Sequence, residues 1–248
     1  MTLTRIASQA VIQLVVAGVI YGTSAGASAE LAAGFGDGLA AAGRSAEDKA
    51  RDAARHPQAV LEFVGISAGM TVLDVAASTG WYTEVLSAAV GPDGRVIAHN
   101  TLGRQARSEP AITAKVDRLG NITALFADFD SLGLDSEVDA ALTALNLHDL
   151  QNRSADAGQL FLSGIFKALK PGGVFAVIDH EGSAGQDNSA LHRLELAVAK
   201  SALVKAGFVV EDVSDVLHNP ADDHTLGIRA KSLQRNTDRF LVRARKPL

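Results

Sequence analysis

The chain has 248 residues and no cysteine, which excludes disulfide bonds and thiolate chemistry. Its formal charge of -5 gives no general electrostatic reason to expect binding to nucleic acid or to anionic lipid. The length fits one large α/β domain, alone or with an extra terminal segment. It is long enough to bury a sizeable core. Small molecules are therefore the expected partners. The sequence makes no prediction of the oligomeric state.

The N-terminal residues 1–29 have the pattern of a secretory signal peptide. Arg5 is the only charged residue before Glu30, and an apolar stretch covers residues 10–20. It leads to Ala27-Ser28-Ala29, which fits the A-x-A cleavage pattern. A retained membrane anchor is the alternative, but the apolar run is only about half of the roughly 20 residues that a spanning helix needs. We expect export to the periplasm, cleavage after Ala29 and no stable membrane span afterwards.

The segment after the cleavage site, residues 30–44, is rich in glycine and alanine without a clear period. This composition predicts a flexible lead-in, so that the folded domain covers residues 45–248. Ser45, followed three residues later by Asp48, predicts the start of a helix. Pro57 is expected to end that helix or to begin another short one.

From residue 71 onward, apolar runs alternate with helical segments at the spacing of βαβ units, which predicts an α/β fold with a parallel sheet. The expected strands are 71–75, 95–99, 122–127, 138–145, 174–179, 208–213 and 240–245. The expected helices cover 82–90, a segment that ends with 163–169, and 191–206. Lys170-Pro171-Gly172-Gly173 is expected to stop the middle helix.

The most informative stretch is MTVLDVAASTGWYTE, from Met70 to Glu84. An apolar strand ends on Asp74, a group of small residues follows, and a helix begins after Gly80. Small residues let a ligand approach the backbone at the carboxyl end of a strand, where a helix N-terminus also faces it. The stretch therefore predicts a nucleoside-binding turn that departs from the glycine-rich ideal.

In this order of elements, the chain resembles the class I S-adenosylmethionine-dependent methyltransferases, in particular a group that bears signal peptides. The matching segments are Arg55-His56-Pro57, MTVLDVAASTGWYTE, GPDGRVIAHN, LNLHDL, LKPGGVFAVIDH, AGF, NPADDHT and DRFLVRARKP. They extend over roughly residues 45–247. The resemblance implies a Rossmann-like class I methyltransferase fold: a mostly parallel seven-stranded sheet with an antiparallel last strand and helices on both faces. It also implies S-adenosylmethionine as the cofactor.

In that family the turn after the first strand reads D/E-x-G-x-G-x-G and wraps the methionine part of the cofactor. The corresponding residues here are Asp74, Ala76, Ser78 and Gly80. The resemblance implies that Asp74 holds the cofactor's ammonium group, directly or through water, and that Trp81 walls the pocket. Alanine and serine leave less room than glycine, which reaches positive φ and carries no Cβ. The alternatives are a short turn that binds nothing and a Trp81 that only packs the helix on the sheet.

The remaining cofactor contacts are implied at the ends of later strands. Asn100 stands where the family usually has an acid that accepts both ribose hydroxyls, although a lone Asn most often satisfies a turn. Asp128 and Phe129 are implied at the adenine, as an acceptor for its amine and a ring that packs on the base. Ordinary solvated turn residues are the alternative for this pair. Asn146 follows the fourth strand, where the family positions its substrate.

Two histidines are candidates for the chemical step. His148 follows the fourth strand and can take a proton from an oxygen or nitrogen that accepts the methyl group. His180, just past the fifth strand, is the second candidate. Hydrogen-bonded turn groups are the alternative for both. No metal is expected, because the sulfonium already activates the methyl donor.

A later loop also carries metal-ligand residue types at close spacing, at His218, Asp222, Asp223 and His224. We favour a polar loop between two strands over a metal site, and the resemblance to the family implies that this loop closes over the site.

Two functions remain open. The first is a methyltransferase that acts on an unidentified small molecule by a single in-line transfer. The second is a non-catalytic exported binding protein on a methyltransferase scaffold, favoured by the departures at Ala76, Ser78 and Asn100 and by the cytoplasmic origin of S-adenosylmethionine. A nicotinamide dehydrogenase is disfavoured, because the turn lacks G-x-G-x-x-G and Asn100 replaces the ribose-binding acid.

Overall fold

In the computed structural model, which describes residues 30–248, one seven-stranded sheet has the strand order β3-β2-β1-β4-β5-β7-β6. The strands are β1 (Thr71–Val75), β2 (Arg95–Asn100), β3 (Ile122–Phe126), β4 (Val138–Ala144), β5 (Leu169–His180), β6 (Val209–Ser214) and β7 (Arg239–Arg245). β7 runs antiparallel to both of its neighbours, whereas β1 to β5 pair in parallel. The predicted fold is confirmed.

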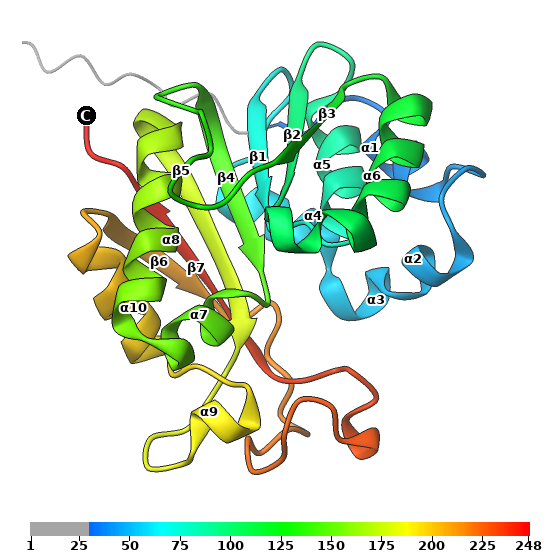
Figure 1. The fold of residues 1–248 in the computed structure, drawn as a ribbon. Helices are drawn as coiled ribbons and strands as arrows, with labels where there is room; N and C mark the ends of the chain where they lie inside the picture. Colours follow the sequence, from blue (N-terminus) through cyan, green and yellow to red (C-terminus); the bar gives the residue numbers. More distant parts are fainter. Residues whose placement is uncertain (1–29) are drawn as a thin grey trace, which may run out of the picture.

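Helices cover both faces of the sheet (Figure 1). They are α1 (Phe35–Ala40), α2 (Ala46–Ala50), α3 (Asp52–Arg55), α4 (Pro57–Val64), α5 (Trp81–Val90), α6 (Gln105–Leu119), α7 (Leu147–Arg153), α8 (Ala155–Ala168), α9 (Asn188–Leu191) and α10 (Leu196–Lys205), with 3-10 turns η1 (Leu102–Arg104) and η2 (Lys231–Leu233). Within β1, Val72 packs in the apolar cluster shared with α4, α5 and α6, and Leu73 packs in the cluster shared with α8 and α10. A strand buried on both faces is mostly apolar, which is why a continuous apolar run in the sequence predicts it.

The sheet has a topological switch point between β1 and β4. From β1 the chain builds outward through β2 to β3, and it then crosses back to β4 on the other side of β1. The loops that leave the carboxyl ends of β1 and β4 therefore diverge, and in open α/β sheets this divergence forms the ligand crevice.

Residues 30–44 differ from the predicted flexible lead-in. α1 lies against α5, with Phe35 buried in the core, and the Ala32 N–H donates to the carbonyl of Ala89 at 2.8 Å. Burial of one Phe contributes roughly 2–3 kcal/mol, and it adds to the contacts of Leu31 and Leu39 with the same core cluster. The order expected to begin near Ser45 begins earlier. The predicted signal peptide lies outside the described residues. Within residues 30–248, no helix has both the length and the apolar character needed to cross a membrane.

Two boundaries also differ from prediction. β5 begins at Leu169, which pairs with Val138 ahead of a register shift, so the expected helix stop at residues 170–173 is part of a strand. The helix expected over 191–206 begins only at Leu196, as α10, because the chain leaves the separate short helix α9 at His192, which adopts a left-handed conformation with φ of +55°. Ser45 caps α2 as predicted, accepting from the N–H of Asp48 at 3.0 Å.

Candidate functional site

The turn after β1 keeps the backbone of a glycine turn although it has only one of the three glycines. φ is +56° at Ala76, +55° at Ser78 and +82° at Gly80. Glycine adopts this left-handed region freely, whereas an L side chain there costs roughly 1–2 kcal/mol. The chain therefore departs from D/E-x-G-x-G-x-G in its side chains and follows it in its backbone.

Two fully buried residues at the end of β2 hold this turn. The Asn100 side chain accepts from the N–H of Ser78 at 2.8 Å and donates to the Ser78 carbonyl at 3.1 Å. His99 Nδ1 accepts from the N–H of Ala76 at 3.3 Å, and Nε2 donates to the carbonyl of Ala127 at 2.9 Å. Burial lowers the pKa of His99, which fits a neutral ring with its proton on Nε2. These contacts offset the strain of the left-handed residues, each by about 1 kcal/mol.

Asn100 is therefore placed differently from the implied ribose ligand. Both polar atoms of its amide bind the backbone of Ser78, and its side chain is fully buried beneath the turn. A carboxylate at this position can accept from the N–H but cannot donate to the carbonyl. The geometry supports the alternative interpretation, in which Asn100 satisfies a turn.

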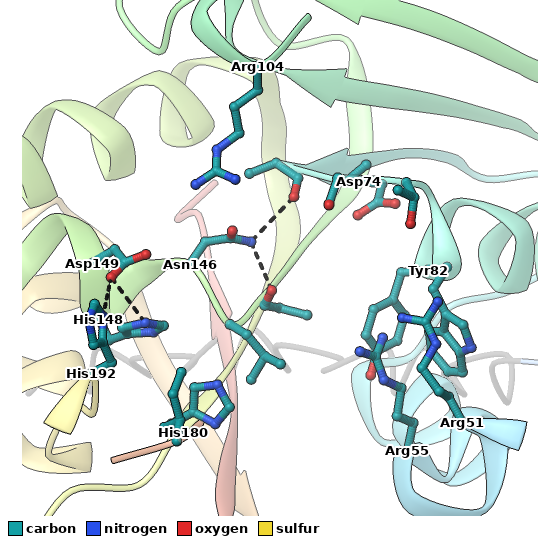
Figure 2. A pocket seen from close by; sticks show the side chains of 18 of the residues that line it. Arg51, Arg55, Asp74, Tyr82, Arg104, Asn146, His148, Asp149, His180 and His192 are labelled. Atoms are coloured by element: carbon teal, nitrogen blue, oxygen red, sulfur yellow. Dashed lines mark hydrogen bonds and ion pairs between the residues drawn. The ribbon is translucent and has the colours of Figure 1, made fainter. Parts of the chain in front are cut away.

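A cavity of about 330 Å³ lies at the switch point. The predicted site residues that line it are Asp74, Ala76, Ser78, Trp81, Asn146, His148 and His180. It is also lined by Tyr82 and by charged residues that the sequence had not marked, among them Arg51, Arg55, Arg104, Asp149 and His192. Figure 2 shows two groups that face each other across this cavity, with Asn146 between them. One group contains Asp74 and Arg55, and the other contains His148 and Asp149.

A second pocket of about 140 Å³ adjoins the first, and both are lined by Ala76 and Asn146. Phe129 lines this second pocket, with its ring 4.8 Å from that of Phe161. Asp128 and Gly80 line neither of these two pockets: Asp128 is exposed, and Gly80 is buried. The two pockets together extend from the end of β1 past the ends of β2 and β3.

The first group is formed by the turn and by α3. Asp74 is buried and accepts from the hydroxyl of Thr83 at 2.5 Å, and burial raises its pKa to about 7. The guanidinium of Arg55 lies 4.5 Å from the centre of the Trp81 ring and 5.8 Å from that of Tyr82. Burial lowers the pKa of Arg55 to about 10, so this side chain is a cation at neutral pH. The indole N–H of Trp81 donates to the carbonyl of Asp48 at 2.9 Å, which fixes the ring.

The second group is built on a histidine and a buried aspartate. His148 Nδ1 lies 2.6 Å from an oxygen of Asp179, which is fully buried in β5. Asp179 also accepts from the backbone N–H groups of His148 and His180, both at 2.8 Å. Burial lowers the pKa of His148, but the hydrogen bond and the negative charge of Asp179 outweigh it, so that the pKa is raised overall. The carboxylate thus holds the proton on Nδ1 and leaves Nε2 available, 3.3 Å from Asp149.

Two more histidines adjoin this pair. The His180 ring lies 5.4 Å from that of His148, and its Nδ1 is 2.6 Å from the hydroxyl of Thr237. Burial lowers the pKa of His180 well below its usual value, and the positive charges of His148 and arginines nearby add to this effect. His192 Nδ1 lies 3.0 Å from Asp149. No local sequence signal marks His192, because it reaches the site through the pairing of Glu181 with Leu194 just beyond β5.

The polar loop that carries the other candidate ligands has its acidic groups already engaged. Asp222 binds the guanidinium of the fully buried Arg193 through both oxygens, at 2.8 and 2.9 Å. His218 and His224 bind the two oxygens of Asp238, at 3.0 and 2.8 Å. Asp223 binds the hydroxyl of Thr225 on the surface at 2.7 Å. Through Asp238 the loop is fastened just before the start of β7, and through Arg193 to the segment between α9 and α10.

Sequence comparisons find similarity to methyltransferases. Residues 48–128 match the family described as protein-L-isoaspartate(D-aspartate) O-methyltransferase (PCMT). The ubiquinone/menaquinone biosynthesis C-methyltransferase UbiE of Pseudomonas fluorescens is 31% identical over 126 residues, which are 48% of this chain and 45% of that protein. The chain spans about half or less of the length of the curated relatives it matches.

Solved structures extend the similarity over most of the chain. A SAM dependent methyltransferase from Aquifex aeolicus has a TM-score of 0.60 and 26% identity, and the match covers 79% of this chain and 92% of that one. The [4+2]-cyclase SpnF has a TM-score of 0.62 and 21% identity, covering 84% and 85%. The region matched by the family includes β1, the left-handed turn and β2. In its strand order, turn geometry and relatives taken together, the chain is similar to the class I S-adenosylmethionine-dependent methyltransferases.

Proposed function

We propose that this protein transfers a methyl group from S-adenosylmethionine to a small molecule in a single in-line step. The observation that carries the proposal is the backbone of the turn after β1. A turn that only joins a strand to a helix has no need of left-handed φ at Ala76 and Ser78. Strain that the surrounding structure maintains is typical of ligand-binding sites.

The residues of the two pockets fit the chemical groups of this cofactor. Asp74 offers a carboxylate to an ammonium group, and Arg55 offers a guanidinium to a carboxylate. The second pocket, beside Phe129, suits a flat aromatic base. When bound, the cofactor supplies a methyl group on a positively charged sulfur. Ala76 and Ser78 retain the glycine-type backbone, so they differ from a glycine turn only by side chains that take up some of the room beside the cofactor.

His148 is the residue that we place beside the methyl acceptor. An oxygen or nitrogen acceptor must lose one proton as it gains the methyl group. Nε2 of His148 is suited to receive that proton, because Asp179 holds the other ring nitrogen in its protonated form at 2.6 Å. Asp179 thus corresponds to the carboxylate that orients a histidine in other enzymes, and His148 to the imidazole that accepts a proton. His180 lines the same cavity, with its ring 5.4 Å from that of His148.

A small acceptor is supported by the size of the cavity, about 330 Å³, at the lower end of the range for small-molecule sites. The name of the Pseudomonas fluorescens relative places that protein in quinone biosynthesis, which is small-molecule chemistry. The charge of -5 argues against nucleic acid as the substrate. We also propose export, on the signal-peptide pattern of residues 1–29. Mass spectrometry of the mature N-terminus tests it: an intact Met1 in cytoplasmic protein refutes export.

A second candidate is a protein that uses the same scaffold for something other than methyl transfer. SpnF, whose name describes a cyclase, has the same fold, so the fold by itself does not determine the reaction. Binding of the cofactor distinguishes the two candidates only in part. Measured turnover, seen as release of S-adenosylhomocysteine, decides between them.

Calorimetric titration of residues 30–248 with S-adenosylmethionine and S-adenosylhomocysteine is the first test. Absence of binding at millimolar ligand refutes the proposal. Asp74→Ala should weaken binding strongly, because it removes the partner of the ammonium group. His148→Ala should leave binding intact and lower turnover by about 100-fold or more, with turnover measured on the small-molecule fraction of a bacterial extract. His218→Ala is the matched control, since this exposed histidine lies in the loop outside the cavity.

A further inference from the structure

We propose that His148, Asp149 and His192 bind one divalent transition-metal ion, Zn²⁺ or a similar cation, at the acceptor side of the cavity. The proposal deepens the proposed function, because the site opens into the same cavity. Ion binding itself does not require that the protein be a methyltransferase. It can therefore be tested separately.

The spacing of the donor atoms already approaches that of a metal site (Figure 2). The Asp149 oxygen lies 3.3 Å from His148 Nε2 and 3.0 Å from His192 Nδ1. All three donor atoms lie within 4.8 Å of one another. Donor atoms bound to Zn²⁺ at 2.0–2.1 Å in a tetrahedron are about 3.3 Å apart. Two of the three separations therefore fit, and a small movement of one imidazole brings in the third.

The His148 ring is held in the way that metal-binding histidines are held. Such histidines almost always donate their second ring N–H to a carboxylate or a carbonyl, which fixes the ring and strengthens the nitrogen that binds metal. Asp179 provides this carboxylate at 2.6 Å and is itself fixed by the N–H groups of His148 and His180. Its complete burial makes it an internal part of the fold. This second observation separates the site from a chance surface cluster.

The carboxylates around His148 also favour a cation. Asp149 faces Nε2 and would contact the proposed ion directly, whereas Asp179 lies on the opposite side of the ring, at Nδ1. Arg193, next to His192 in the chain, points elsewhere and pairs with Asp222 at 2.8 Å. Imidazole nitrogens with one carboxylate oxygen are a donor set that suits Zn²⁺ and other first-row divalent ions.

Three protein donors leave at least one coordination position open, as in catalytic zinc sites. The side of the cluster that lines the cavity is where that position lies. The site therefore selects an acceptor with a group that can coordinate the ion, such as a phenol or a thiol. The ion lowers the pKa of that group and so assists loss of its proton. In the metal-bound protein His148 is a ligand through Nε2, and its role as a base applies to the metal-free protein.

The test is a titration of untagged, chelator-treated protein with ZnCl₂ in the absence of S-adenosylmethionine. Calorimetry is expected to show one ion per chain, and Co²⁺ in its place should give the visible absorption of a tetrahedral site. Asp149→Ala and His192→Ala should each weaken Zn²⁺ binding at least 10-fold. Asp179→Asn should weaken it about 10–100-fold, the usual effect of losing an orienting carboxylate. His218→Ala should bind Zn²⁺ as the unaltered protein does.

Two results overturn the proposal: no binding of Zn²⁺ at micromolar concentration, or equal binding by His192→Ala and the unaltered protein. Far-ultraviolet circular dichroism and calorimetry with S-adenosylmethionine show whether each variant still folds. His192 is half-buried and lies between α9 and α10, outside the sheet, so His192→Ala should fold even where Asp179→Asn does not. If Zn²⁺ binds but S-adenosylmethionine does not, only the proposed function fails. If the cofactor binds but Zn²⁺ does not, only the metal site fails.

Discussion

Asp74→Asn should stabilise the fold while it removes cofactor binding. The Asp74 carboxyl is buried at the end of β1, and burial raises its pKa from 3.8 to about 7. The folded protein must therefore protonate this group or bury its charge, whereas the unfolded chain ionises it freely. Each pKa unit corresponds to about 1.4 kcal/mol, so the buried carboxyl destabilises the folded state by at most ~4 kcal/mol at neutral pH. Asparagine removes that penalty and still accepts from Thr83.

The dependence on pH gives the signature of this effect. Because the folded pKa is raised, the stability linked to Asp74 is fully present below about pH 4 and is lost as the pH rises toward 7. Asparagine resembles the neutral acid at every pH. The difference in free energy of unfolding between the variant and the unaltered protein should therefore grow by about 1.4 kcal/mol per pH unit between pH 4 and 7. It should then remain constant above pH 7.

Urea denaturation at several values between pH 4.5 and 8.5 measures the stability difference, and calorimetry at pH 7.5 measures cofactor binding. Asp130→Asn is the control, since Asp130 is exposed and its replacement should give no comparable trend. A difference that is independent of pH refutes the reasoning. So does an asparagine variant that is less stable than the unaltered protein at pH 8, or one that binds S-adenosylmethionine equally well.

Four further substitutions and one control test the turn and the N-terminal segment by urea denaturation. Ala76→Gly and Ser78→Gly should keep or raise the free energy of unfolding, by up to about 1 kcal/mol each, because glycine relieves the left-handed strain. Ala77→Gly is the control: φ is not positive at Ala77, so this change should lower the free energy of unfolding. A loss of stability at both left-handed positions contradicts the account of the turn. Asn100→Ala should lower the free energy of unfolding by roughly 1–3 kcal/mol and weaken cofactor binding, since it removes both hydrogen bonds to the backbone of Ser78. An unchanged affinity for S-adenosylmethionine would show that the turn does not need this support. Phe35→Ala should cost about 3–5 kcal/mol if α1 is an integral part of the fold, and a change within error shows that it is not.

The strands could be predicted from sequence because their periodicity is local. β1 was predicted at its observed bounds, Thr71–Val75, since a strand buried on both faces needs a continuous apolar run. The lead-in was misjudged because Leu31, Phe35 and Leu39 pack against the core, a tertiary contact that a composition rich in glycine and alanine does not show. The start of β5 was misjudged because Leu169 joins the sheet through its pairing with Val138, a contact that no local pattern shows.

The sequence by itself placed Asp74, Ala76 and Ser78 in one turn and His148 at the end of another strand, because parallel strands bring their carboxyl ends to one edge. It did not determine the backbone of the turn, since His99 and Asn100 impose that geometry from β2. The partners of His148 were equally beyond local reasoning. Asp179 reaches it across the β4–β5 pairing, and His192 reaches Asp149 over a separation of 43 residues. Side-chain chemistry is encoded locally, but distances between strands and loops are decided only when the whole sheet is assembled.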